Sequence, residues 1–170
     1  MDETTLLRLI QRHAPALRSK CLIEGIGDDC AVFRPQGSRE DWLITTDMVL
    51  EDRHFRRATH PATAVGHRTL ARGLSDIAAM GGEPRFALLS LAVSPWAGSR
   101  WLVAFFRGFH ALARQARTPL IGGDLAKAEK LGCDIIVCGA VPRGTALRRD
   151  GARPGDSIFL SGRLGGSALG

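Results

Sequence analysis

Hydrophobic and polar positions follow each other along the chain in blocks that predict helices separated by pairs of strands. Apolar residues recur at helical spacing in three segments, at 4–19, 61–80 and 98–117. Shorter apolar or alternating runs predict strands at 29–33, 42–48, 85–93, 118–122, 133–141 and 156–161. Gly81-Gly82 is a plausible stop signal for the second helix.

The order of these elements predicts an α+β fold. Strands come in adjacent pairs between helices, which favours a two-layer sandwich with a mixed or antiparallel sheet covered by helices on one face. The run RFALLSLAV at 85–93 is too continuously apolar for a surface strand, so we place it in the centre of the sheet. A regular doubly wound βαβ repeat does not fit this order.

Composition supports a globular protein. The chain has 170 residues, enough for one domain with its own core, and is 45% hydrophobic and 24% charged. No stretch approaches the roughly 20 apolar residues that a membrane span needs. The N-terminus carries Asp2 and Glu3 and no long apolar segment, so we interpret it as an amphipathic helix rather than a signal peptide. We therefore expect a cytoplasmic protein.

The charge and the cysteines exclude two other classes. The net charge is +6, but the arginines are scattered and the chain has no Tyr, so we predict no nucleic-acid partner. No pair among the four cysteines has CxxC spacing, which argues against a zinc site. We expect reduced, mostly buried thiols.

Candidate chemistry lies in four short stretches that place acids beside glycines or at the ends of elements. They are GIGDDC (25–30), ITTDM (44–48), LSDIAAMGG (74–82) and IGGD (121–124). Carboxylate and hydroxyl oxygens are ligands that suit Mg²⁺. Converging carboxylates repel one another unless a cation lies between them, so we predict that Asp29, Asp47, Asp76 and Asp124 form one magnesium cluster.

Each stretch also has a simpler interpretation. Asp28 and Asp29 could terminate a turn, and Asp124 could be an N-cap or turn residue. Asp76 could be a solvated helix charge, paired at i,i+4 with Arg72. Thr45 and Asp47 are harder to dismiss, because a strand places both on the same face. The chain has no GxxxxGK[ST] loop, so phosphate binding would depend on magnesium, glycine amides and arginine.

Taken together, the motifs resemble those of the thiamine-monophosphate kinases. GIGDDCAVF, LITTDMVLEDRHF, LARGLSDIAAMGGEPRFALLSLAV, LIGGD and VPRGTALRRDGARPGDSIFLSG match in order and spacing over essentially the whole chain. The resemblance implies a PurM-like fold of the AIR-synthase superfamily, with an ATP- and Mg-binding domain at 1–155 and the start of a C-terminal domain at 156–170. It also implies transfer of phosphate from ATP to thiamine monophosphate, giving thiamine diphosphate.

The resemblance also assigns roles to single residues. It implies Mg²⁺ ligands at Asp29, Thr45, Thr46, Asp47, Asp76 and Asp124, with Asp28 in support. It implies a substrate contact at His54 and contacts to ATP from the Gly123 backbone and Arg149. It implies a homodimer joined through strands, for which Ile44–Val49 and Phe86–Val93 are candidates.

Some positions depart from the family pattern. Gly73 stands where Asn is usual, Asp52-Arg53 precedes His54, and GGD is followed by Leu125-Ala126-Lys127 instead of two hydroxyls and an arginine. Two alternatives therefore stay open, namely another ATP-dependent enzyme of the superfamily and a non-catalytic nucleotide-binding or dimerisation module. Because the family completes its acceptor pocket with a second domain, we expect this chain alone to bind Mg-ATP weakly and not to phosphorylate thiamine monophosphate.

Overall fold

The computed structural model describes residues 2–14, 19–160, 162, 164 and 165, which form one six-stranded sheet with three helices. The strands are β1 (Leu22–Glu24), β2 (Ala31–Phe33), β3 (Glu40–Leu50), β4 (Glu83–Val93), β5 (Leu120–Lys127) and β6 (Gly132–Pro142). The helices are α1 (Glu3–His13), α2 (Ala62–Ala79) and α3 (Ser99–Gln115).

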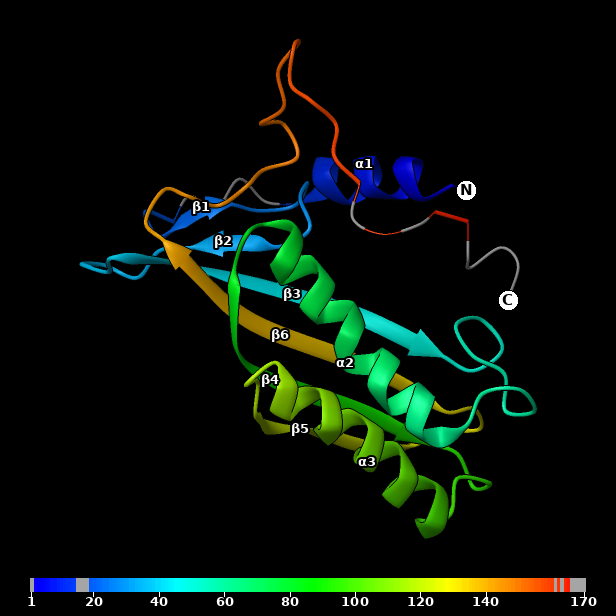
Figure 1. Cartoon of the computed structure of the whole chain (residues 1–170). Helices are drawn as coiled ribbons and strands as arrows, with labels where there is room; N and C mark the ends of the chain where they lie inside the picture. The colour runs from blue at the N-terminus through cyan, green and yellow to red at the C-terminus, as the bar shows by residue number, and fades with distance from the viewer. Residues whose placement is uncertain (1, 15–18, 161, 163, 166–170) are drawn as a thin grey trace.

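The strand order in the sheet is β1-β2-β3-β6-β4-β5. Only β4 and β5 pair in parallel, and the other neighbours are antiparallel. Helices α2 and α3 lie side by side on one face of this sheet, while α1 lies beyond its β1 edge (Figure 1). The predicted α+β sandwich, with a mixed sheet covered on one face, is confirmed.

The core lies between the sheet and the two helices. Alternate residues of β6, such as Ile135 and Val137, are fully buried against them, as are Phe105 and Phe109 of α3. The helices approach so closely that a Cβ atom added at Gly108 would lie 1.9 Å from the carbonyl oxygen of Thr63. Glycine is therefore required there by contact between backbones rather than by a turn.

The second face of the sheet carries no helix over the described residues and remains partly open. Ile44 and Met48 of β3 are 38% and 52% exposed on this face, which we call the open face. Trp42 of β3 and Phe86 of β4 make a tilted aromatic pair there, with ring centroids 5.9 Å apart. The two strand segments predicted to join copies of the chain thus each have one buried side and one open side.

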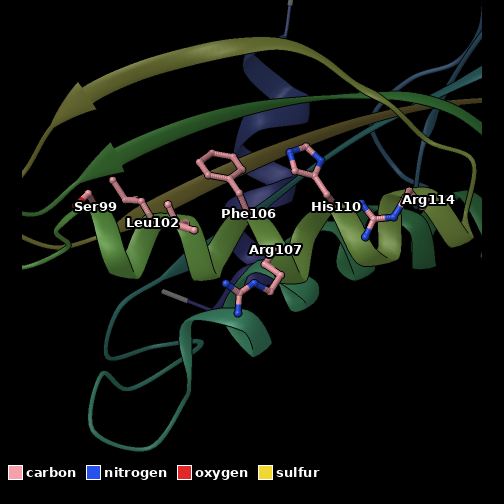
Figure 2. A pocket seen from close by; sticks show the side chains of 7 residues that line it. Ser99, Leu102, Phe106, Arg107, His110 and Arg114 are labelled. Atoms are coloured by element: carbon pink, nitrogen blue, oxygen red, sulfur yellow. The ribbon is translucent and has the colours of Figure 1, made fainter.

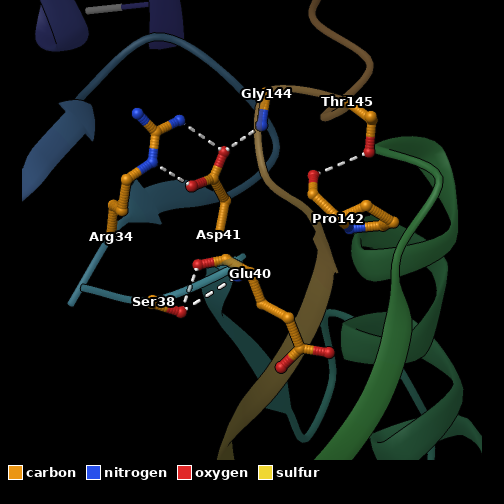
Figure 3. Close-up of polar contacts among 7 residues, drawn as sticks. All are labelled: Arg34, Ser38, Glu40, Asp41, Pro142, Gly144 and Thr145. Atoms are coloured by element: carbon orange, nitrogen blue, oxygen red, sulfur yellow. Dashed lines mark hydrogen bonds and ion pairs between the residues drawn. The ribbon is translucent and has the colours of Figure 1, made fainter. Parts of the chain in front are cut away.

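The beginning of β3 is fixed to the loop after β6 by a buried carboxylate. Both oxygens of Asp41 accept hydrogen bonds from Arg34, at 2.5 and 2.8 Å, and Oδ2 also accepts from the Gly144 backbone N–H at 2.8 Å (Figure 3). Asp41 is only 1% exposed. A charge buried to this degree needs such partners, since desolvation otherwise disfavours it.

Several predicted bounds need correction. Helix α1 ends at His13 instead of continuing to 19, and 15–18 lie outside the described residues. The short strand β1 was missed, and β5 extends to Lys127 rather than 122. Residues 156–160 form no strand, with Ile158 97% exposed; residue 161 is not described. None of the helices in the described part of the chain is long and apolar enough to cross a bilayer.

Candidate functional site

The centre of the candidate site is the contact between β3 and α2. Thr45 and Asp47 share one face of β3, as predicted, and because they alternate with open-face residues this face is turned toward the helices. Thr45 Oγ1 donates to Asp76 Oδ2 at 2.6 Å, joining the ITTDM strand to the LSDIAAMGG helix. The simpler interpretation of Asp76, as a surface charge paired with Arg72, is wrong, because Arg72 is engaged elsewhere.

Arg72 binds Asp47 instead. Its Nε donates to Oδ2 at 2.7 Å and its Nη2 donates to Oδ1 at 2.5 Å, so both carboxylate oxygens are occupied. The side chains are 32% and 21% exposed. This two-bond geometry is the strongest form of an arginine–carboxylate contact.

The GIGDDC turn meets the segment after β6. Arg149 Nη2 donates to Asp29 Oδ1 at 2.8 Å, and the Arg149 backbone N–H donates to Asp28 Oδ2 at 2.9 Å. Burial acts to raise the pKa of Asp28, but the N–H groups of Arg149 and Asp29 outweigh it and hold that pKa below its usual value. A cavity of about 220 Å³ lies here, lined by Glu24, Gly27, Asp28, Arg148, Arg149 and Asp150.

The acids of these two contacts share one electrostatic neighbourhood. Burial raises the pKa of Asp76, and the charges of Asp47 and Asp29 raise it further against the opposing Thr45 hydrogen bond. Burial also raises the pKa of Cys30 to about 12, with added contributions from Asp76 and Asp29. Asp29 and Asp47 therefore each act on Asp76 as like charges.

Asp124 does not join them within a single chain. It pairs in register with Ser90 of β4, which pairs with Asp134 of β6, and these residues lie on the open face. Asp47 pairs with Ile135, which is buried on the helix face. The prediction that all four acids converge is therefore wrong for one chain, because β6 and β4 separate β3 from β5.

The open face holds one polar contact that the sequence did not reveal. Thr46 Oγ1 donates to Asp134 Oδ1 at 2.5 Å. Thr46 thus points away from Thr45 and Asp47, so the side chains of the three predicted ligands are divided between two faces. An aspartate inside the apolar run GCDIIVCG was the signal for Asp134.

His54 lies in the loop that follows β3. Its Nδ1 accepts the Leu50 backbone N–H at 3.0 Å, which leaves the proton of the neutral ring on Nε2. A cavity of about 530 Å³ is present, lined by Asp52, Arg53, His54, Phe55, Arg56, Thr59 and His60. The predicted substrate contact is therefore part of a cavity wall.

Gly123 and Asp124 border a different, mostly apolar cavity between β5 and α3. It has a volume of about 350 Å³ and is lined by Leu89, Leu91, Phe106, Leu120, Gly122, Gly123, Asp124 and Leu125. Phe106 stacks on His110 with centroids 5.8 Å apart, and Figure 2 shows both rings on the same side of α3. Sequence reasoning missed Phe106, because helical spacing alone marks it as a core residue.

The candidate ligand oxygens are of the chemical type that suits Mg²⁺, but arginine side chains bind some of them. Over the described residues, no three Asp, Glu, His or Cys side chains are gathered closely enough for a ready-made cation site. Carboxylate and hydroxyl oxygens are nevertheless the ligands Mg²⁺ prefers. Arg72 engages both oxygens of Asp47, so a cation would have to exchange with it there, whereas Arg149 engages only Oδ1 of Asp29.

Comparison with known proteins shows which family the chain belongs to. Residues 27–142 match the family described as AIR synthase related protein, N-terminal domain. This chain belongs to that family. It is also 37% identical over 172 residues to the thiamine-monophosphate kinase of Bacillus subtilis (strain 168), covering 100% of this chain and 52% of the relative.

Two further relatives agree. The thiamine-monophosphate kinase of Salmonella typhimurium is 39% identical over 165 residues, which are 95% of this chain and 49% of that protein. A solved structure, AaThiL complexed with AMPPCP and TMP, aligns with a TM-score of 0.77 and 32% identity, covering 89% of this chain and 45% of that one. The resemblance seen in the motifs is confirmed, and the chain spans about half the length of the curated relatives it matches.

Proposed function

We propose that this chain forms the ATP- and magnesium-binding part of a kinase that phosphorylates thiamine monophosphate to thiamine diphosphate. The observation that carries the proposal is the hydrogen bond from Thr45 of β3 to Asp76 of α2, on the same strand face as Asp47. The relatives that match along the whole chain carry the same activity in their name, and one of them was solved with AMPPCP and TMP.

Phosphoryl transfer needs little covalent chemistry from a protein, so the residues act mainly by positioning and by charge. Asp29, Asp47 and Asp76 would hold Mg²⁺, with Thr45 fixing the Asp76 carboxylate. Bound Mg²⁺ neutralises charge on the phosphates. In this proposal Arg149 would contact phosphate oxygens as a two-bond donor, and His54 would contact the acceptor.

The apolar cavity beside Gly123 gives the nucleotide base a place to bind. Phe106 offers an aromatic ring, and the Gly123 backbone has no side chain to block a close approach. Base sites of this kind are mostly apolar, and Leu89 and Leu91 of β4 line this one. We assign the adenine of ATP to this cavity.

Homodimerisation through the open face is part of the proposal. Ile44 and Met48 leave apolar surface there, and Asp124 cannot reach Asp47 within one chain. A second copy packed there would cover these apolar residues and would approach Asp124, whose register position lies on the same face. A dimeric mass by light scattering at tens of micromolar is expected, and a monomeric mass at that concentration would remove this part of the proposal. We also place the protein in the cytoplasm.

The direct test is calorimetric titration of the chain with ATP in the presence and absence of Mg²⁺. Asp47→Asn should weaken Mg-ATP binding at least about tenfold, since it removes one anionic oxygen ligand. Glu83→Gln is the matched control, because Glu83 is an 82% exposed acid on β4 outside the site. Unchanged affinity in Asp47→Asn, or equal losses in both variants, would contradict the proposal.

A second candidate function is nucleotide binding without turnover. Leu125 is 74% exposed and, with Ala126, supplies no hydroxyl beside the predicted phosphate site. A coupled assay with ATP, Mg²⁺ and thiamine monophosphate on the protein including any second domain separates the two. Thiamine diphosphate formation supports the kinase, whereas Mg-ATP binding without product supports the binding module.

A further inference from the structure

The Arg72–Asp47 pair stands where the proposed magnesium site needs a free carboxylate. Both oxygens of Asp47 are engaged by one guanidinium, at 2.7 and 2.5 Å. A divalent cation bound to Asp47 needs at least one of these oxygens at about 2.0–2.1 Å. The cation and the guanidinium therefore compete for the same atoms.

The surroundings favour exchange over a permanent pair. Asp76 lies one turn after Arg72 on α2 and accepts a hydrogen bond from Thr45, two residues before Asp47, so a second carboxylate is held beside the pair. One arginine brings a single positive charge, and a divalent cation brings two at a shorter distance. The Arg72 side chain is 32% exposed, so its guanidinium has solvent into which it can move.

We propose that Arg72 is a built-in counter-ion that occupies Asp47 in the metal-free protein, leaves it when a divalent cation binds, and thereby sets the cation concentration at which the site fills. This inference rests on the metal site of the proposed function. It concerns a residue to which neither the motifs nor the named relatives assign a role. It also gives Asp47 a positive counter-charge in the absence of metal.

The test is binding of Mn²⁺, as a paramagnetic substitute for Mg²⁺, to the 170-residue chain without nucleotide, followed by electron paramagnetic resonance. Arg72→Gln should bind Mn²⁺ about five- to tenfold more tightly than the wild type, because the guanidinium that competes for Asp47 has been removed. The affinity of Arg72→Lys for Mn²⁺ should lie between these two, since a lysine keeps the charge but cannot make the two parallel hydrogen bonds of a guanidinium.

Two controls separate competition at Asp47 from a general change in charge. Arg68→Gln removes an exposed arginine one turn earlier on α2 and should change the affinity less than about twofold. In an Asp47→Asn background, Arg72→Gln should not increase the affinity for Mn²⁺. Residue 47 then has no carboxylate for which the arginine and the cation compete. Thermal melts of each variant show that the fold is retained.

The outcomes distinguish the inference from the function beneath it. Equal or weaker Mn²⁺ binding in Arg72→Gln and Arg72→Lys, with wild-type binding intact, overturns the role of Arg72 and leaves the metal site standing. The role of Arg72 is also overturned if Arg68→Gln increases the affinity for Mn²⁺ as much as Arg72→Gln does. It is likewise overturned if Arg72→Gln gives its full increase in affinity in the Asp47→Asn background. No Mn²⁺ binding by any variant or by the wild type overturns the inference and the metal site together.

Discussion

Two aspartates on the same face of β3 each hold an arginine by two hydrogen bonds, yet their surroundings differ. Asp41 binds Arg34 and also accepts the Gly144 backbone N–H, and it is 1% exposed. Asp47 binds Arg72 without a third donor among the described residues, and its side chain is 21% exposed.

The neighbouring charges widen the difference. The Arg34 hydrogen bonds hold the pKa of Asp41 below its usual value, with the Gly144 N–H acting in the same direction against burial. Asp47 instead lies near Asp76, a like charge whose pKa the Asp47 charge helps to raise. A carboxylate saturated by donors fixes a structure, whereas one surrounded by further acids and held by a single arginine is suited to exchange that arginine for another cation.

The largest expected effect is on stability. Asp41→Asn should lower the free energy of unfolding by about 2–3 kcal/mol, because Arg34 loses its anionic partner in a buried setting. Asp47→Asn, the same change on the same strand face, should lower it by less than about 1 kcal/mol. Urea denaturation of both variants measures this. Equal losses would show that the two pairs are alike and would remove the comparison.

Lowering the pH tests the stabilising role of Asp41 independently. Because the folded-state pKa of Asp41 is lowered, its stabilisation is complete above the unfolded value of about 3.9 and is lost as pH falls through the lower folded value. The difference in melting temperature between the wild type and Asp41→Asn should therefore be constant from pH 7 to 5 and shrink toward pH 2. A difference that does not change with pH would contradict the assignment.

The smallest expected effect is an increase in stability, on substitution of Asp76. The pKa of Asp76 is raised, so its charged form is disfavoured above that pKa and the penalty disappears as the group becomes protonated in acid. Asp76→Asn keeps an acceptor for Thr45 and should stabilise the metal-free chain at pH 7 by less than about 1 kcal/mol, with no gain below about pH 4. Calorimetric melts without metal test this, and a loss of stability at pH 7 would count against it.

Much of the fold could be predicted, because long periodic segments identify their own type. The runs at 61–80 and 98–117 became α2 and α3 within two residues at each end. The strand prediction at 156–161 was wrong over the described residues 156–160. A strand needs a neighbouring strand to pair with, and an apolar pattern does not supply one. Ile158 and Phe159 are instead 97% and 89% exposed.

The site was predictable only where local spacing decides it. Alternation along β3 was enough to place Thr45 and Asp47 on one face. The partner of Arg72 was not predictable, because Asp47 lies 25 residues away and meets α2 only through the packing of helix on sheet. The separation of Asp124 from Asp47 likewise depends on strand order, which spacing within single segments does not specify.

The strand order also has a consequence for synthesis on the ribosome. Of the six strands described, β6 is made last, yet it lies in the middle, between β3 and β4. Until Pro142 has emerged, the β1-β2-β3 and β4-β5 groups have unpaired edges and cannot join. Because such late, non-local pairing leaves strand edges exposed while the chain grows, the nascent protein is expected to be most prone to misassociation just before β6 inserts.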